Sequence, residues 1–185
     1  MSSLFPRELR AERILLRAPR AEDAAVIFAR YASDAQVTRF LCWPSHRSVD
    51  DTRAFLSVAM RQWNEGTGFA FLIESRDGAR LIGSVGLTMN EPHCATTGYA
   101  LASDAWGHGF ATEALCALMK NAFEAPFLMR VQALCHTAHA ASENVLEKSG
   151  FVREGILRRH TVFPNFDPNE PQDVALWARV RGKRH

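Results

Sequence analysis

A glycine turn between a strand-like run and an amphipathic helix constrains the fold of this chain more than any other stretch. Residues 97–102 (TGYALA) predict the end of a strand, and residues 106–115 (WGHGFATEAL) predict a turn that opens into a helix. The first N–H groups of such a helix lack intrahelical acceptors and lie at the positive end of its dipole. The stretch therefore predicts an anion site, and phosphate is the usual anion there. A Gly-x-Gly pair also occurs in plain loops, so the ligand of this turn has to be inferred from the rest of the sequence.

Composition narrows the class of protein. The 185 residues are 47% apolar and 23% charged, which is typical of a globular protein and predicts a single domain over residues 1–185. The net charge of +2 gives no reason to expect nucleic acid as a partner, and no apolar run is long enough to span a membrane. The four cysteines form no C-x-x-C pair, which predicts reduced thiols in a cytoplasmic protein. Cys135, His136 and His139 lie close together without a second ligand pair, so we expect no metal.

The remaining patterns predict a mixed sheet that begins as an antiparallel meander and crosses over through a helix to a parallel neighbour. Asp77-Gly78 predicts a hairpin turn, Ser48 or Asp50 a helix start, and Gly150 a helix end. The expected strands are residues 12–17, 69–74, 81–88, 94–102, 127–136, 151–159 and 173–180. The expected helices are residues 21–31, one that begins after Ser48, one that follows the glycine turn and ends before Pro126, and residues 140–149.

Several further motifs stand in a fixed order along the chain. They are RILLR at 13–17, FLCWP at 40–44, LIGSVGL at 81–87, Gly98-Tyr99, the glycine turn at 106–115, Ser142 with VLEKSGF at 145–151, EGILR at 154–158 and Asp173-Val174. Over about residues 10–181, this set resembles the GNAT superfamily of acyl-CoA-dependent N-acetyltransferases, and within it the RimJ/RimL-type ribosomal-protein N-terminal acetyltransferases. The resemblance implies an α/β fold of the α+β type, with a mixed, mostly antiparallel sheet of about six to seven strands and about four helices.

The resemblance assigns a cosubstrate, acetyl-CoA, to the glycine turn. In the family a Gln/Arg-x-x-Gly-x-Gly/Ala turn wraps the CoA pyrophosphate, and here Gly109 and Ala111 take the small positions while Trp106 replaces Gln or Arg. The resemblance also implies that residues 99–103 diverge from residues 131–136 and that pantetheine bonds to the backbone in this split. The implied cofactor-binding residues are Leu101, Ala102, Ser103, Trp106, Gly107, His108, Gly109, Phe110, Ala111, Thr112, His139 and Ser142.

The resemblance also indicates which side chain protonates the leaving CoA thiolate. Many GNAT enzymes use a tyrosine on the helix before the terminal Gly-Phe, but the matching residue here is Leu146. The Rim-type branch carries an Asn-x-x-Ser pattern instead, whose serine corresponds to Ser142 and whose asparagine corresponds to His139. Ser142 is therefore the candidate acid. The alternative is that Ser142 only bonds the local backbone near a helix start.

The general base is not defined by the sequence. Relatives often carry a glutamate on the strand that leads to Gly98-Tyr99, where this chain has Thr96-Thr97. Glu91 and His93 lie just upstream, but single residues of this kind in a loop are usually only solvated. Neither is assigned as the base.

The expected function is acetyl-CoA-dependent acetylation of a primary amine, most simply a protein or peptide N-terminus, by a cytoplasmic monomer or homodimer. Acetylation of a small amine, such as an antibiotic or polyamine, remains an alternative, as does a CoA-binding module without catalysis. A dinucleotide-binding oxidoreductase is disfavoured, because Thr112 occupies the third glycine position and the turn lies mid-chain.

Overall fold

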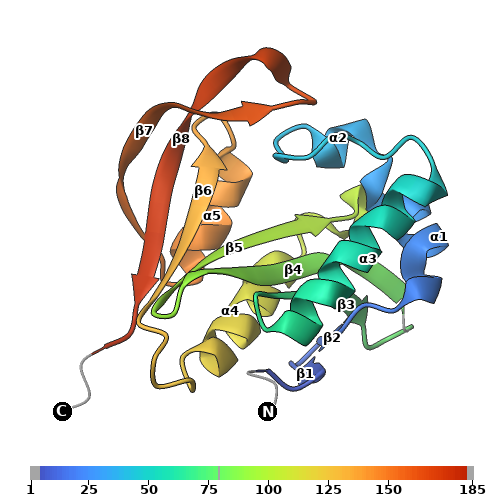
Figure 1. Cartoon of the computed structure of the whole chain (residues 1–185), viewed down its shortest axis with the longest axis horizontal. Helices are drawn as coiled ribbons and strands as arrows, with labels where there is room; N and C mark the ends of the chain where they lie inside the picture. The colour runs from blue at the N-terminus through green and yellow to red at the C-terminus, as the bar shows by residue number, and fades with distance from the viewer. Residues whose placement is uncertain (1–4, 79, 183–185) are drawn as a thin grey trace.

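The described part of the chain builds one sheet with helices on both faces (Figure 1). The computed structural model describes residues 5–78 and 80–182. Its strands are β1 (Glu8–Arg10), β2 (Ile14–Arg17), β3 (Gly68–Ser75), β4 (Arg80–Glu91), β5 (Cys94–Leu101), β6 (Arg130–His136), β7 (Val152–Phe163) and β8 (Asp167–Val180). They form an eight-stranded sheet in the order β1-β2-β3-β4-β5-β6-β8-β7. The expected strands are present, and the strand beyond the predicted six to seven is β1, which is too short for a recognisable pattern.

The helical segments differ from prediction mainly before residue 48. They are η1 (Ala21–Asp23), α1 (Ala24–Ile27), η2 (Phe28–Ala32), α2 (Ala35–Thr38), α3 (Val49–Glu65), η3 (Ser103–Ala105), α4 (Phe110–Ala122) and α5 (Ala140–Lys148). The single helix predicted over residues 21–31 is thus a 3-10 turn, a short α-helix and a π-helical turn in succession. Ser48 caps α3 as predicted, and Gly66 ends it in the left-handed conformation with φ of 72°. No helix in the described ranges is long and apolar enough to cross a membrane.

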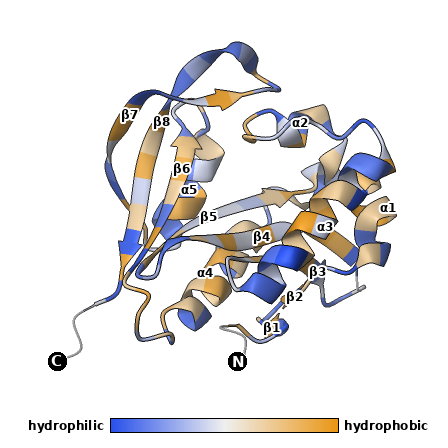
Figure 2. Ribbon diagram, viewed as in Figure 1, coloured by the Kyte–Doolittle hydropathy of each residue, from blue (hydrophilic) through white to orange (hydrophobic). Residues whose placement is uncertain are grey.

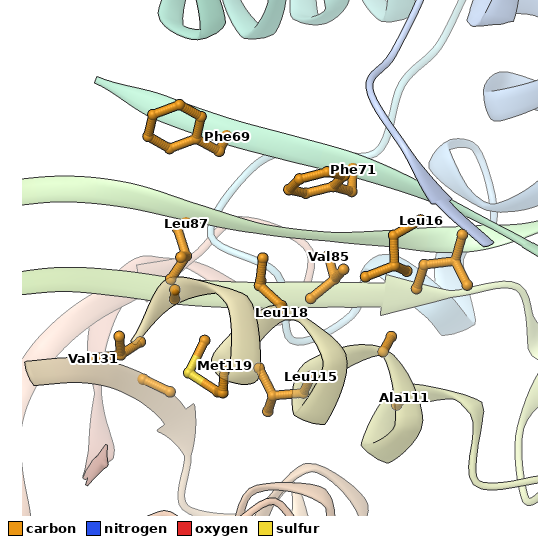
Figure 3. Close-up of a cluster of buried hydrophobic side chains, with 14 of the residues drawn as sticks. Leu16, Phe69, Phe71, Val85, Leu87, Ala111, Leu115, Leu118, Met119 and Val131 are labelled. Carbon is orange, nitrogen blue, oxygen red and sulfur yellow. The ribbon is translucent and has the colours of Figure 1, made fainter. Parts of the chain in front are cut away.

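Each face of the sheet has its own helical cover. On one face Leu115 and Leu118 of α4 are fully buried in a cluster with Val85 of β4 (Figure 3). On the other face Leu56 of α3 packs in a second cluster with Leu72 of β3. Figure 2 shows both hydrophilic and hydrophobic residues on α3, as expected of a helix that covers a sheet with one side only. The sheet thus lies between the two covers, and η3 with the glycine turn connects the end of β5 to the start of α4.

The sheet divides where β5 and β6 separate. These two strands run parallel and pair only through Cys94–Arg130, Ala95–Val131 and Thr96–Gln132. Beyond that point β5 continues alongside β4, while β6 continues alongside β8 (Figure 1). The strands therefore separate as the resemblance implied, and within residues 5–78 and 80–182 no strand pairs with the backbone edges that face the split.

Candidate active site

Two left-handed glycines shape the turn before α4. Gly107 has a φ of 78° and Gly109 a φ of 79°, a region that favours glycine because glycine has no Cβ. Gly109 is the N-cap of α4, and its carbonyl oxygen accepts from the Glu113 N–H at 3.0 Å. The N–H groups of residues 110–112 precede this bond and have no acceptor within the helix. They are available to an anion at the positive end of the helix dipole.

Arg13, the residue before β2, holds this turn in place through its hydrogen bonds. Its backbone N–H donates to Glu113 Oε1 at 2.7 Å, and its Nε donates to Oε2 at 2.8 Å. Its Nη1 donates to the His108 carbonyl oxygen at 2.9 Å, and its guanidinium lies 4.8 Å from the centre of the Phe110 ring. The ion pair offsets the charge of a carboxylate that would otherwise repel an anion from the first turn of α4. The turn is therefore suited to the phosphates of CoA.

The end of β5 directs backbone groups into the split. The Ala102 N–H donates to the Ile82 carbonyl oxygen, from the adjoining β4, at 2.9 Å. Because alternate residues of an antiparallel strand direct their backbone groups to opposite sides, the Leu101 N–H points away from β4. The Leu101 carbonyl oxygen accepts from Trp106 Nε1 at 2.9 Å. Trp106, which replaces the Gln or Arg of the general family pattern, thus ties the turn to the strand.

A pair of hydroxyl groups connects β5 to α5 across the split. Tyr99 Oη lies 2.8 Å from Ser142 Oγ and 3.1 Å from the Ser142 carbonyl oxygen. Burial raises the pKa of the Tyr99 phenol above its ordinary value, so the phenol stays protonated and can donate. Ser142 is thus bonded to a side chain on the opposite wall of the split.

Two histidines, His136 at the end of β6 and His139 at the start of α5, precede Ser142 in the chain. His139 is the N-cap of α5, and its carbonyl oxygen accepts from the Ser142 N–H at 3.0 Å. The rings of His139 and His136 each lie 4.8 Å from the ring of Phe40. Burial lowers the pKa of both imidazoles. Both side chains are therefore neutral at pH 7.

The cysteine beside these histidines is a buried thiol. Cys135 Sγ lies 3.7 Å from the His139 carbonyl oxygen. Burial raises the pKa of the Cys135 thiol, although a hydrogen bond from Ser142 acts in the opposite direction. Within residues 5–78 and 80–182, no three or more His, Cys, Asp and Glu side chains are grouped so that they could hold a metal ion.

Other residues considered from the sequence are directed elsewhere. Leu146 is buried in the main core and has no proton to donate. Glu91 and His93 are exposed at the turn between β4 and β5, at the paired end of β5 and away from the split. The Thr97 hydroxyl donates to the Gly86 carbonyl oxygen at 2.8 Å. The Ser103 hydroxyl donates to Asp34 Oδ2, at 3.1 Å, at the start of α2.

Comparison with known proteins identifies the family. A family model described as an acetyltransferase (GNAT) domain matches residues 13–152. The N-acetyltransferase YoaA of Bacillus subtilis, itself uncharacterised, is 30% identical over 180 residues, which cover 96% of this chain and 98% of that protein. The chain belongs to the GNAT acetyltransferase family. It is therefore a GNAT N-acetyltransferase, as the order of motifs predicted.

Two further relatives of this GNAT N-acetyltransferase are of the Rim type. The ribosomal-protein-serine acetyltransferase of Escherichia coli is 29% identical over 143 residues, which cover 76% of each chain. The structure of Mycobacterium smegmatis RimJ in complex with CoA-disulfide is similar with a TM-score of 0.84 at 25% identity, covering 97% of this chain and 90% of that one. The predicted likeness to the RimJ/RimL branch is confirmed.

Two side-chain contacts of the site were not predicted from the sequence. Tyr99 and Arg13 both stand within motifs that carry the family resemblance. Their partners Ser142 and Glu113 lie 43 and 100 residues further along the chain, however. Periodicity and local spacing report only on near neighbours, so neither contact has a signal in a single sequence.

Proposed function

We propose that this GNAT N-acetyltransferase transfers an acetyl group from acetyl-CoA to the terminal amine of a protein or peptide. The observation that carries the proposal is the junction of an anion-binding helix start with a split in the sheet. The turn at residues 106–112 suits a pyrophosphate, and the split suits an extended pantetheine, because both present unpaired backbone groups. The ribosomal-protein-serine acetyltransferase of E. coli supports the acceptor class, and the structure of M. smegmatis RimJ with CoA-disulfide supports the cofactor.

Each part of the site has a role in this proposal. Acetyl-CoA, when bound, supplies an acetyl group activated as a thioester. The N–H groups at the start of α4 hold its phosphates, and the end of β5 with the start of α5 holds the pantetheine. Leu101 directs its N–H into the split, where it stabilises negative charge on the carbonyl oxygen during attack by the amine. Ser142 gives its hydroxyl proton to the departing sulfur, and the hydrogen bond between Tyr99 Oη and Ser142 Oγ orients the serine hydroxyl.

The proposal is tested by release of CoA thiol from acetyl-CoA in the presence of candidate amines. The panel comprises peptides with different N-terminal residues, aminoglycosides and polyamines. We expect thiol release with peptides, and mass spectrometry should place one acetyl group on the α-amine. Turnover with an aminoglycoside or polyamine alone would reassign the acceptor to a small amine.

The same assay tests whether catalysis is lost in this chain, in which Leu146 replaces the family tyrosine. In a protein without catalysis, acetyl-CoA would raise the melting temperature, but thiol release would stay at background with every amine.

We further propose a cytoplasmic location with reduced thiols. We also propose that the protein is a monomer or a homodimer, which sedimentation would distinguish. The two exposed cysteines, Cys42 and Cys116, are free thiols, in agreement with a reducing compartment.

A further inference from the structure

An aromatic cluster lies where the end of β6 meets the segment after α2 and the β7–β8 hairpin. Phe40 stacks on the His139 ring with an interplanar angle of 29°. The Phe166 ring lies 5.5 Å from the Phe40 ring and 4.9 Å from the His136 ring. The Arg39 guanidinium lies 5.3 Å from the rings of both Phe40 and Phe166. Residues from distant parts of the chain thus fix the plane of the His139 ring.

The two imidazoles of this cluster differ in their hydrogen bonds. His136 Nδ1 accepts from the Ala138 N–H at 3.0 Å, so the ring proton of neutral His136 is on Nε2. That Nε2 is buried and has no acceptor. The ring nitrogens of His139, in contrast, have no hydrogen-bond partner among the residues that the structure describes. Neutral His139 therefore carries a free lone pair, and it stands three residues before Ser142.

The surroundings favour the neutral form of His139. Burial is the main cause of its lowered pKa, and His136 on β6 is the second. His136 in turn is influenced by burial, by Arg39 after α2 and by Asp173 on β8. Glu143 is the acidic residue in the first turn of the same helix. A base with a lowered pKa is in its proton-accepting form at neutral pH.

We infer that His139 is the general base for the acceptor amine and that Phe40 positions its ring; the inference rests on the proposed acetyl transfer. The acceptor ammonium gives one proton to the free ring nitrogen of His139, and the amine nitrogen forms a bond to the acetyl carbon. The bond from that carbon to sulfur breaks, and the sulfur keeps the electron pair and takes the Ser142 hydroxyl proton. The second proton of the attacking nitrogen restores Ser142, and His139 releases its proton to solvent.

The competing role for His139 is a hydrogen bond to pantetheine, which the resemblance gives to asparagine at this position. Asparagine can make such a bond but cannot accept a proton at neutral pH. The substitution His139→Asn therefore removes a base while keeping the capacity for a cofactor contact. His93→Asn is the matched control, because His93 is exposed at the other end of β5.

The experiment measures acetyl transfer by both variants and the wild type from about pH 5 to about pH 9, together with CoA affinity by calorimetry. We expect His139→Asn to lower kcat about 100-fold, as for loss of a general base, and to change the CoA Kd less than about threefold. The acid limb of the wild-type profile should have its midpoint below the ordinary histidine value of about 6.5. Imidazole resonances should show His139 titrating at that midpoint. His93→Asn should match the wild type.

Three results overturn the inference. A wild-type rate and pH profile in His139→Asn would exclude a base while leaving acetyl transfer intact. A rate loss matched by an equal loss of CoA affinity would assign His139 to the cofactor contact. A wild-type protein that acetylates no amine would overturn the proposed function and this inference together. Phe40→Leu supplies a further check, because it should move the His139 pKa toward 6.5 and lower kcat with little change in the CoA Kd.

Discussion

Ser142 takes its side-chain partner from a strand across the split rather than from its own helix. A serine near a helix start commonly bonds the local backbone. Here Ser142 Oγ lies 2.8 Å from Tyr99 Oη, on β5. Burial raises the pKa of the Tyr99 phenol, so the phenol keeps its proton at neutral pH, and this contact orients the serine hydroxyl beside the split.

Substitution of these two residues tests the proton path. We expect Ser142→Ala to lower kcat about 100-fold, since it removes the acid, while the CoA Kd stays within about threefold. Tyr99→Phe should lower kcat by about tenfold, because Ser142 remains but loses its orienting bond. Steady-state kinetics and calorimetry measure both effects. Ser57→Ala, on the outer side of α3, is the control. Wild-type turnover in Ser142→Ala would remove this serine from the mechanism.

At the scale of elements, the start of α4 depends on Arg13, the residue that precedes β2. Arg13 reaches both the Glu113 carboxylate in the first turn of α4 and the His108 carbonyl oxygen in the preceding turn. Without Arg13, the negative charge of Glu113 would act against phosphates at the same helix start. The turn at residues 106–112 therefore depends on two distant elements, although the backbone N–H groups available to an anion come from α4 alone.

Arg13→Gln should consequently weaken binding of acetyl-CoA rather than slow the chemical step. We expect KM for acetyl-CoA to rise about tenfold, equivalent to about 1.4 kcal/mol, with kcat changed less than about twofold. Arg10→Gln is the matched control, because its side chain is exposed and its ion-pair contact with Glu8 is long, at 3.8 Å. Initial-rate kinetics in both substrates separate the two effects. An unchanged KM in Arg13→Gln would contradict the bracing role.

Elements with a strong local pattern were predicted well, and those without one were not. The turn at Asp77-Gly78, the Ser48 cap and the Gly150 stop each have a local cause and stand where expected. Residues 151–159 predict the beginning of a strand, and residues 173–180 predict another; β7 continues to Phe163 and pairs irregularly with β8, which begins at Asp167. Residues 164–171 contain three prolines and lack the alternation of apolar and polar residues that indicates a strand. The extension of β7 and β8 therefore follows from their pairing in the sheet and has no local signal.

In the candidate site, too, local features are predictable from the sequence and long-range contacts are not. Its glycine turn and the helix start after it are predictable, because the two features lie next to each other in the sequence. Tyr99 on β5 contacts Ser142 on α5, and the Phe40 ring, from the segment after α2, stacks on His139. Such meetings are set by how the sheet divides, and a single sequence carries no signal of them.

At the scale of the whole molecule, Asn165 holds the β7–β8 hairpin against the segment after α2. Its Nδ2 donates to the carbonyl oxygens of Thr38 and Trp43, each at 2.8 Å. Its Oδ1 accepts from the Ser45 N–H at 2.8 Å. These bonds connect residues more than a hundred positions apart and keep the aromatic cluster around His139 assembled.

Asn165→Ala should destabilise the protein by about 2 kcal/mol, because it leaves partly buried backbone groups without partners. For a chain of this length, that loss corresponds to a fall in Tm of roughly 4–8 °C. Differential scanning calorimetry measures it. Asn144→Ala, at an exposed position of α5, is the control. A Tm equal to that of the control would show that the hairpin is held by its aromatic contacts alone.

A second long-range contact joins β2, η1 and β3 through charges. The Arg17 guanidinium donates to both oxygens of Asp23, at 2.8 and 2.7 Å, and to Glu74 Oε1 at 2.7 Å. The side chains of Arg17 and Asp23 are only 11% and 10% exposed. Burial alone would raise the pKa of Asp23, but hydrogen bonds from Arg17 and Arg20 outweigh it and lower the pKa. The folded state therefore binds a proton at Asp23 less readily than the unfolded chain does.

This difference makes the stability of the molecule depend on acid pH. Because the folded pKa of Asp23 lies below the unfolded value of about 3.9, the stabilisation is complete above that value and is lost as the pH falls through the folded pKa. Asp23→Asn should cost about 3 kcal/mol at pH 7, as for a broken buried pair, and the difference from wild type should shrink below about pH 4. Urea unfolding from about pH 7 to about pH 3 measures this, with Asp50→Asn, an exposed residue of α3, as the control. A difference that stays constant with pH would mean that Asp23 acts through packing and hydrogen-bond geometry rather than through its charge.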